Sequence, residues 1–190
     1  MKAFLAGILI GIVIVPLAVY YYFSTGRAPV ATTDKPLPFE HKLANSALHA
    51  HINKEMIKTP PIPANEENYL AGAPIYREHC AVCHGLPGQE PDMIAKGMFP
   101  KPPRLFRGKG VTDDEPGETY WKVANGIRLT GMPAFKSSLN DTQMWQVSLL
   151  LANADKISDR VKQELKGPTT EQAVSSQAAQ EPAVSSRRKH

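Results

Sequence analysis

The hydrophobic residues at the N-terminus form one unbroken run. Residues 3–23 carry no charge, and a helix of this length spans roughly 31 Å, enough to cross the hydrocarbon core of a membrane. The run ends in bulky aromatic residues, which suit a membrane surface, rather than in the small residues of a cleavage site, although a cleaved signal sequence is the alternative. Lys2 precedes the run. We therefore predict a single-pass anchor at residues 1–23, contact with lipid through residues 3–23, and export of the remainder.

Residues 24–64 combine a proline-rich stretch with a helical pattern. Residues 24–38 contain three prolines, which predicts an extended linker. Apolar residues then recur at steps of three and four, which predicts an amphipathic helix over 39–58. The stripe consists of Phe39, Leu43, Ala47, Leu48, Ile52 and Met56. This helix could lie on the membrane or pack on the domain that follows, and the sequence leaves both roles open.

A compact all-α domain is expected over residues 65–166. Helical periodicity dominates this segment, no part of it alternates as a strand would, and a loop rich in glycine and proline fills residues 85–110. Beyond it, residues 167–190 contain no large apolar side chain except valine. Such a tail cannot bury enough surface to offset the entropy of ordering it, so we expect it to be disordered.

Polar residues at helix starts divide the domain into its elements. Serine, threonine, aspartate and asparagine bind the free N–H groups of a first helical turn, and a glutamate or glutamine three positions later completes a capping box. The expected signals are Asn65 for a helix that runs to the cysteines, Thr112 with Glu115 for a helix over about 113–125, Asn140 with Gln143 for the next, and Ser158 for a short last helix.

Charge excludes one class of partner. The chain carries a formal net charge of +4, but residues 64–167 contain 13 lysines and arginines against 13 aspartates and glutamates. Nucleic-acid binding needs a concentrated basic face, and no part of the sequence provides one. We therefore expect no nucleic-acid partner.

The two cysteines carry the strongest chemical signal. Cys80 and Cys83 are separated by two residues and followed directly by His84, which is the C-x-x-C-H pattern of covalent haem attachment. Two thiols on one helical turn can bond the two vinyl groups of a porphyrin, and the next residue then lies under the ring as an iron ligand. A thioredoxin-like pair, a structural disulfide and half of a zinc site are the alternatives, but a thioredoxin-like site expects a βαβ setting. We predict one haem c, with His84 as an axial ligand.

Methionine is the expected second axial ligand. Met132 lies in the turn Gly-Met-Pro-Ala-Phe at 131–135, where glycine permits a close backbone approach and proline stiffens the turn. Met93 and Met98 follow His84 closely and are expected on its side of the ring. Met144 belongs to a helical pattern and is expected in the core. We therefore select Met132.

Histidines elsewhere are not expected to bind iron. The candidates for bis-histidine ligation are His41, His49 and His51, and all three precede the domain on the linker helix. Histidines in such a place are expected at the surface or in helix packing. His79 adjoins Cys80 and should point away from the iron.

With these motifs, residues 65–165 resemble a monohaem class I cytochrome c of the bacterial membrane-anchored type. The resemblance rests on Cys-Ala-Val-Cys-His at 80–84 and Gly-Met-Pro-Ala-Phe at 131–135. It implies the class I cytochrome c fold, in which the first and last helices cross beside the haem. It further implies that Gly72 permits the crossing, with Tyr76 one turn later and Val147 and Leu150 on the facing helix.

The same resemblance implies residues around the ligands. In the family a proline carbonyl accepts the Nδ1–H of the proximal histidine, and Pro102 or Pro103 is the counterpart here. Arg104, Trp121 and Asn125 are candidates for the haem propionates, although Trp121 is expected in the core rather than at a propionate.

The function implied is single-electron transfer in a respiratory chain, without catalysis. Two protein ligands leave the iron no open position, and His/Met ligation raises the reduction potential. The expected partners are redox proteins in or near the membrane, and the expected location is the extracytoplasmic, periplasmic side of the bacterial cytoplasmic membrane. A fixed haem subunit of a membrane oxidoreductase complex is the alternative, and a gas sensor or a peroxidase is a more distant one.

Overall fold

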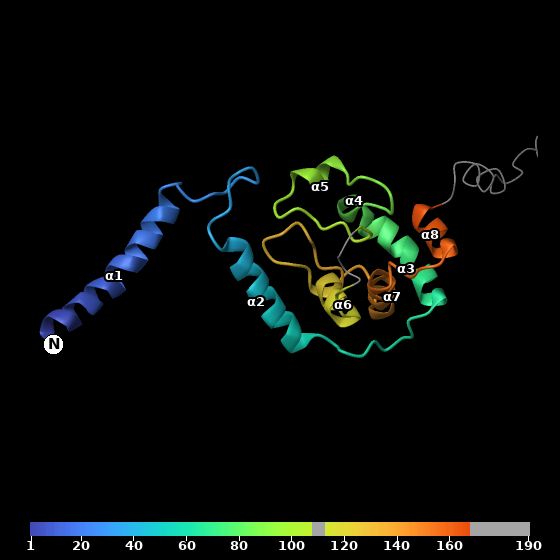
Figure 1. The fold of residues 1–190 in the computed structure, drawn as a ribbon, viewed down its shortest axis with the longest axis horizontal. Helices are drawn as coiled ribbons and strands as arrows, with labels where there is room; N and C mark the ends of the chain where they lie inside the picture. Colours follow the sequence, from blue (N-terminus) through green and yellow to red (C-terminus); the bar gives the residue numbers. More distant parts are fainter. Residues whose placement is uncertain (108–112, 168–190) are drawn as a thin grey trace, which may run out of the picture. The chain divides into compact units, whose positions relative to one another are not determined.

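The computed structural model describes residues 1–107 and 113–167, and every regular element in these two ranges is helical (Figure 1). This confirms the predicted all-α class. The chain divides into two compact units, Met1–Ala47 and Leu48–His190. The elements are α1 (Lys2–Ser24), α2 (Glu40–Glu55), α3 (Glu66–His79), α4 (Ala81–His84), α5 (Met93–Gly97), α6 (Pro116–Asn125), α7 (Asp141–Ala152) and α8 (Asp159–Lys166).

The first unit is dominated by α1. Its length and hydropathy suffice to cross a membrane, and none of its most apolar 18-residue stretch is buried within the protein. The helix keeps Pro16 in its interior, which membrane helices tolerate. After it, the chain is not uniformly extended as predicted, because the Asp34 carboxylate accepts the N–H groups of Val30 and Ala31, both at 2.9 Å, and closes a turn.

The core of the second unit is the crossing of α3 over α7, with α6 and α8 packed beside it (Figure 1). Gly72 makes the crossing close: a Cβ at this position would lie 2.6 Å from the carbonyl oxygen of Gln146. Tyr76 is completely buried one turn later, and Val147 and Leu150 are equally inaccessible on α7. The crossing that the family resemblance implied is therefore present.

Helix starts follow the predicted signals with one exception. Asn65 accepts the N–H of Asn68 at 3.0 Å, the capping box of Asn140 and Gln143 is complete, and Ser158 caps α8. The exception is α6, which begins at Pro116, after Glu115, and has no side-chain cap. Proline suits the first helical position because its fixed φ is already helical, and Thr112 lies outside the described residues.

The end of the linker helix packs on α6. Of the two roles that the sequence leaves open for this helix, packing on the following domain is therefore observed. We call residues 48–57 the strap. Ile52 in the strap is completely buried, and Trp121 on α6 donates its indole N–H to Glu55 at 3.0 Å. Gly117 meets the carbonyl of Ile57 so closely that a Cβ would not fit.

The strap histidines take part in this packing. His49 lies 3.3 Å from the Glu118 carboxylate, and the ring of His51 meets the Trp121 indole edge to face at 5.5 Å. These contacts agree with the expectation that linker histidines pack or lie at the surface. The helix itself is shorter than predicted, because α2 ends at Glu55 and Phe39 before it has a positive φ of 65°.

Replacing Gly117 with alanine should loosen the strap. The new Cβ collides with the Ile57 carbonyl, and overpacking of this kind costs roughly 1–3 kcal/mol. Amide exchange in residues 48–57 should accelerate about tenfold, which corresponds to roughly 1.4 kcal/mol. The matched control is Gly97→Ala, since a Cβ there has no neighbour within 4 Å. Unchanged exchange in the Gly117 variant would show that the strap is not held by this contact.

Candidate haem-attachment site

The residues Cys80, Cys83 and His84 share one tight turn at the junction of α3 and α4. The Cys80 carbonyl accepts the N–H groups of both Cys83, at 3.1 Å, and His84, at 2.9 Å. Gly85 ends the turn with a φ of 75°, and its carbonyl accepts the buried Tyr76 hydroxyl at 2.6 Å. The helix crossing therefore fixes the turn through Tyr76.

Both thiols are free and partly exposed, so the structural disulfide considered above is not formed. Burial, with a smaller contribution from the neighbouring Cys83, raises the pKa of the Cys80 thiol to about 12. The described residues also hold no cluster of three or more histidine, cysteine or acidic side chains suited to a metal ion.

The His84 imidazole is oriented by a backbone carbonyl. Its Nδ1 lies 2.8 Å from the carbonyl oxygen of Pro103. Because a carbonyl can only accept, Nδ1 carries the proton and Nε2 keeps its lone pair, which is the tautomer that binds a metal. Burial lowers the pKa of His84 and the Pro103 hydrogen bond raises it in part, so the ring is held in its neutral form. Of the two predicted prolines, the structure places Pro103 at this nitrogen.

Backbone contacts shape the turn that carries Met132. Gly126 has a φ of 67°, and a Cβ there would lie 2.7 Å from the Ala134 nitrogen and 2.8 Å from the Met132 carbonyl oxygen. The Ile127 N–H donates to that carbonyl at 3.1 Å, and Met132 packs against the core. Gly126 directly follows the last residue of α6. Its positive φ and this close approach make it part of the site.

The three other methionines that were considered as iron ligands occupy different environments. Met93 is 83% exposed, and Met144 is buried in α7 as expected. Met98 lies elsewhere than predicted, because its sulfur packs on Gly131, 2.9 Å from where a Cβ would stand. The expectation that Met98 stays on the His84 side was wrong, since the loop over 85–107 is long enough to reach the turn at 131–135.

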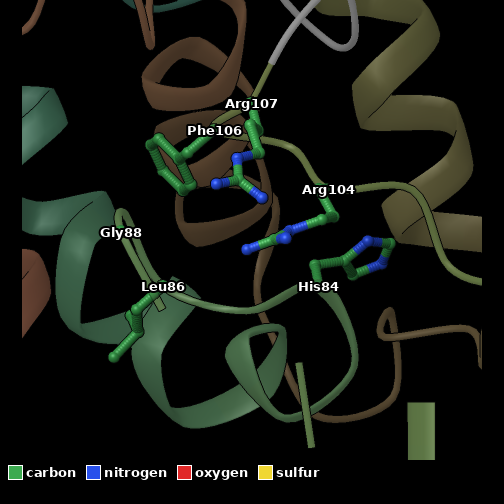
Figure 2. Close-up of a pocket in the computed structure, with 6 residues that line it drawn as sticks. All are labelled: His84, Leu86, Gly88, Arg104, Phe106 and Arg107. Carbon is green, nitrogen blue, oxygen red and sulfur yellow. The ribbon is translucent and has the colours of Figure 1, made fainter. Parts of the chain in front are cut away.

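The polar residues considered for haem propionates have protein partners. Arg104 donates to the Glu90 carboxylate at 2.8 Å and to the Gln89 carbonyl at 2.5 Å. Trp121 binds the strap, as described above, and the Asn125 amide donates to the Trp121 carbonyl at 3.1 Å. Figure 2 shows His84, Arg104 and Arg107 among the residues that line one hollow. The volume of this hollow is about 90 Å³. The Arg104 hydrogen bond lowers the pKa of Glu90, and the Arg104 charge lowers it further.

These residues fit a covalently held haem. The turn offers two free thiols three positions apart, and His84 offers a neutral imidazole whose Nδ1 proton is already bound. Apolar side chains from the loop after His84 and from the Met132 turn pack on the core beside them: Leu86, Leu105, Phe106, Met132 and Phe135. The donor set of imidazole nitrogen and thioether sulfur is that of one-electron haem sites.

Comparison with protein-family models gives one match that agrees with this assignment. Residues 67–149 match the family described as cytochrome c oxidase, cbb3-type, subunit III. No curated protein sequence matches the chain. Among solved structures, a chain of a reducing HAO-like protein complex of Kuenenia stuttgartiensis is similar, with 22% identity and a TM-score of 0.45. The match covers 73% of this chain and 55% of that one.

Proposed function

Residues 67–149 form a cytochrome c domain, and on that premise we propose that the protein carries single electrons through one haem c. In this proposal Cys80 and Cys83 would bond the haem covalently, and His84 and Met132 would supply the two protein ligands of its iron. The observation that carries the proposal is the neutral His84 ring, held on the same turn as both free thiols with its Nδ1 bound to Pro103 at 2.8 Å.

The haem supplies a one-electron ferric–ferrous couple when it is attached. The residues of the chain orient the groups that bind it. Pro103 holds the His84 ring in one tautomer and orientation, so the ligand does not have to reorganise between oxidation states. The Gly126 contact fixes the backbone of the Met132 turn. With both axial ligands supplied by the protein, a substrate or a gas finds no free position, which favours a carrier over a peroxidase or a sensor.

We further propose that α1 tethers the domain to the bacterial cytoplasmic membrane, with the haem on the extracytoplasmic side of that membrane, where it takes part in a respiratory chain. A tether keeps the carrier close to its partners and raises their effective concentration. The strap limits that freedom, because residues 48–57 are packed on α6 and only the segment between α1 and α2 is left to act as a hinge.

A fixed subunit of a membrane oxidoreductase complex is the second candidate. The packed strap favours it, since a short free segment limits the volume that a mobile carrier could search. The matching family is also described as a subunit of a cbb3-type oxidase, and a domain of this kind would pass electrons to a neighbouring subunit.

Purification of the full chain from a host that matures c-type cytochromes tests the proposal. The protein should be coloured, its mass should exceed that of the polypeptide by one haem, and the haem should survive denaturation. Colourless protein, or a mass equal to that of the bare polypeptide, would refute it.

Mild detergent extraction distinguishes the two candidates. A fixed subunit should retain large partner proteins even when residues 1–24 are deleted, because this deletion leaves the strap in place. A tethered shuttle should lose its neighbours on extraction in both forms.

A further inference from the structure

We infer that Arg104 is a positioning residue that sets the reduction potential of the haem through the Pro103 carbonyl. The inference rests on the proposed function, since it requires His84 to be an iron ligand. It assigns to Arg104 a role other than the propionate contact considered from the sequence.

Arg104 joins two segments that are far apart along the chain. One of its nitrogens donates to the Gln89 carbonyl at 2.5 Å and another to the Glu90 carboxylate at 2.8 Å. Residues 89 and 90 follow His84 by only five and six positions, and Arg104 directly follows Pro103. The Arg104 side chain therefore clips the backbone after His84 to the peptide that contacts the His84 ring.

The clip and the His84–Pro103 hydrogen bond close the same loop at two points. The first point is the hydrogen bond from Nδ1 of His84 to the Pro103 carbonyl, at 2.8 Å. The second point is the pair of hydrogen bonds that Arg104, the next residue, donates to Gln89 and Glu90. The residues between them, 91–102, include the short helix α5, whose Met93 and Ile94 are exposed. Ala95 is buried and Met98 packs on Gly131, so the middle of this segment is anchored. Arg104 fixes its end, directly after Pro103, and the direction of the Pro103 carbonyl therefore depends on Arg104.

Figure 2 shows that Arg104 and His84 line the same hollow, with Arg107 farther along the same segment as Arg104. The two arginines differ in their surroundings. The Arg104 side chain is 26% exposed, whereas that of Arg107 is 70% exposed and lies 3.4 Å from Glu90. Both carry one positive charge, but Arg104 is the one that binds the Gln89 backbone. Arg107 is therefore a matched control for charge without the clip.

Loss of the clip and loss of the charge move the potential in opposite directions. A firm hydrogen bond from Nδ1 makes the imidazole a better donor and favours the ferric state, so weakening that bond raises the potential. Removing a nearby positive charge favours the ferric state and lowers the potential. The sign of the change therefore separates positioning from simple electrostatics.

The test compares the haem-loaded full-length protein with its Arg104→Gln and Arg107→Gln variants. Arg104→Gln should raise the midpoint potential and accelerate exchange of the His84 Nδ1 proton, followed by NMR in the reduced protein, by roughly fivefold, the factor for one lost hydrogen bond. Arg107→Gln should lower the potential slightly and leave that exchange unchanged.

A lowered potential in both variants, with unchanged exchange of the Nδ1 proton, would overturn the inference. Arg104→Lys provides a second test that keeps the charge but lacks the planar fork of donors. It should raise the potential without any opposing charge effect, and a potential equal to that of the unmodified protein would likewise contradict the positioning role. Failure of the proposed function is distinct, since the unmodified protein would then lack haem.

Discussion

Replacing Met132 with alanine should remove the long-wavelength absorption band by which ferric cytochromes c report methionine–iron ligation, and should lower the midpoint potential. The thioether sulfur stabilises ferrous iron, and His/Met ligation gives a higher potential than other common ligand pairs. The shortened side chain also opens one face of the iron, so the reduced variant should bind carbon monoxide. Absorption spectra of both oxidation states and a redox titration measure these effects.

The other methionines supply the controls for this experiment. Met93→Ala should leave the band intact, because that side chain is 83% exposed. Met98→Ala is the more demanding control, since its sulfur packs on Gly131 beside Met132. Loss of the band in the Met98 variant and its retention in the Met132 variant would transfer the ligand assignment to Met98.

The helices could be predicted because their signals are local. The Asn65 cap and the Asn140–Gln143 box involve residues three positions apart, so the sequence contains both partners of each interaction. The start of α6 was misplaced because a threonine and a glutamate at the right spacing were given more weight than Pro116. The order of the helices and their class were nevertheless correct.

The site was predictable to the extent that it is contiguous. Cys80, Cys83 and His84 lie on one turn, so their proximity follows from spacing alone. The choice between Pro102 and Pro103 depended on the path of the loop over 85–107, for which local propensity gives no information. The same holds for Met98, which reaches Gly131 through that loop.

Glycines in close contacts form the largest group that sequence reasoning missed. Gly117 faces the backbone of the strap, which is distant in sequence, and Gly126 faces the backbone of the Met132 turn, six to eight residues further along the chain. The sequence around either glycine does not indicate which backbone segment it contacts. In a single sequence, a glycine that ends a helix cannot be distinguished from one that permits a close approach of two backbone segments. Gly72 was found only because the family resemblance implied a crossing there.

Gly72 should be a position at which a single methyl group strongly reduces the stability of the domain. Alanine would place its Cβ 2.6 Å from the Gln146 carbonyl oxygen and 3.1 Å from the Val147 nitrogen. Backbone cannot move aside as a flexible side chain would, so α3 and α7 must separate along the most buried contact of the domain. Overpacking of this kind costs about 2 kcal/mol or more, which for a domain of this size lowers the melting temperature by roughly 10 °C.

The comparison with Gly97→Ala separates the collision from the general effect of replacing glycine. In a helix alanine is favoured over glycine by up to about 1 kcal/mol, and a Cβ at Gly97 meets no neighbour within 4 Å, so this variant should melt at or slightly above the temperature of the parent. Thermal unfolding of the haem-loaded proteins, followed by circular dichroism, measures both. Equal melting temperatures for the Gly72 and Gly97 variants would mean that α3 and α7 do not cross as closely as described. The turn that holds Cys80, Cys83 and His84 would then lose its support, because Tyr76 reaches the Gly85 carbonyl from within that crossing.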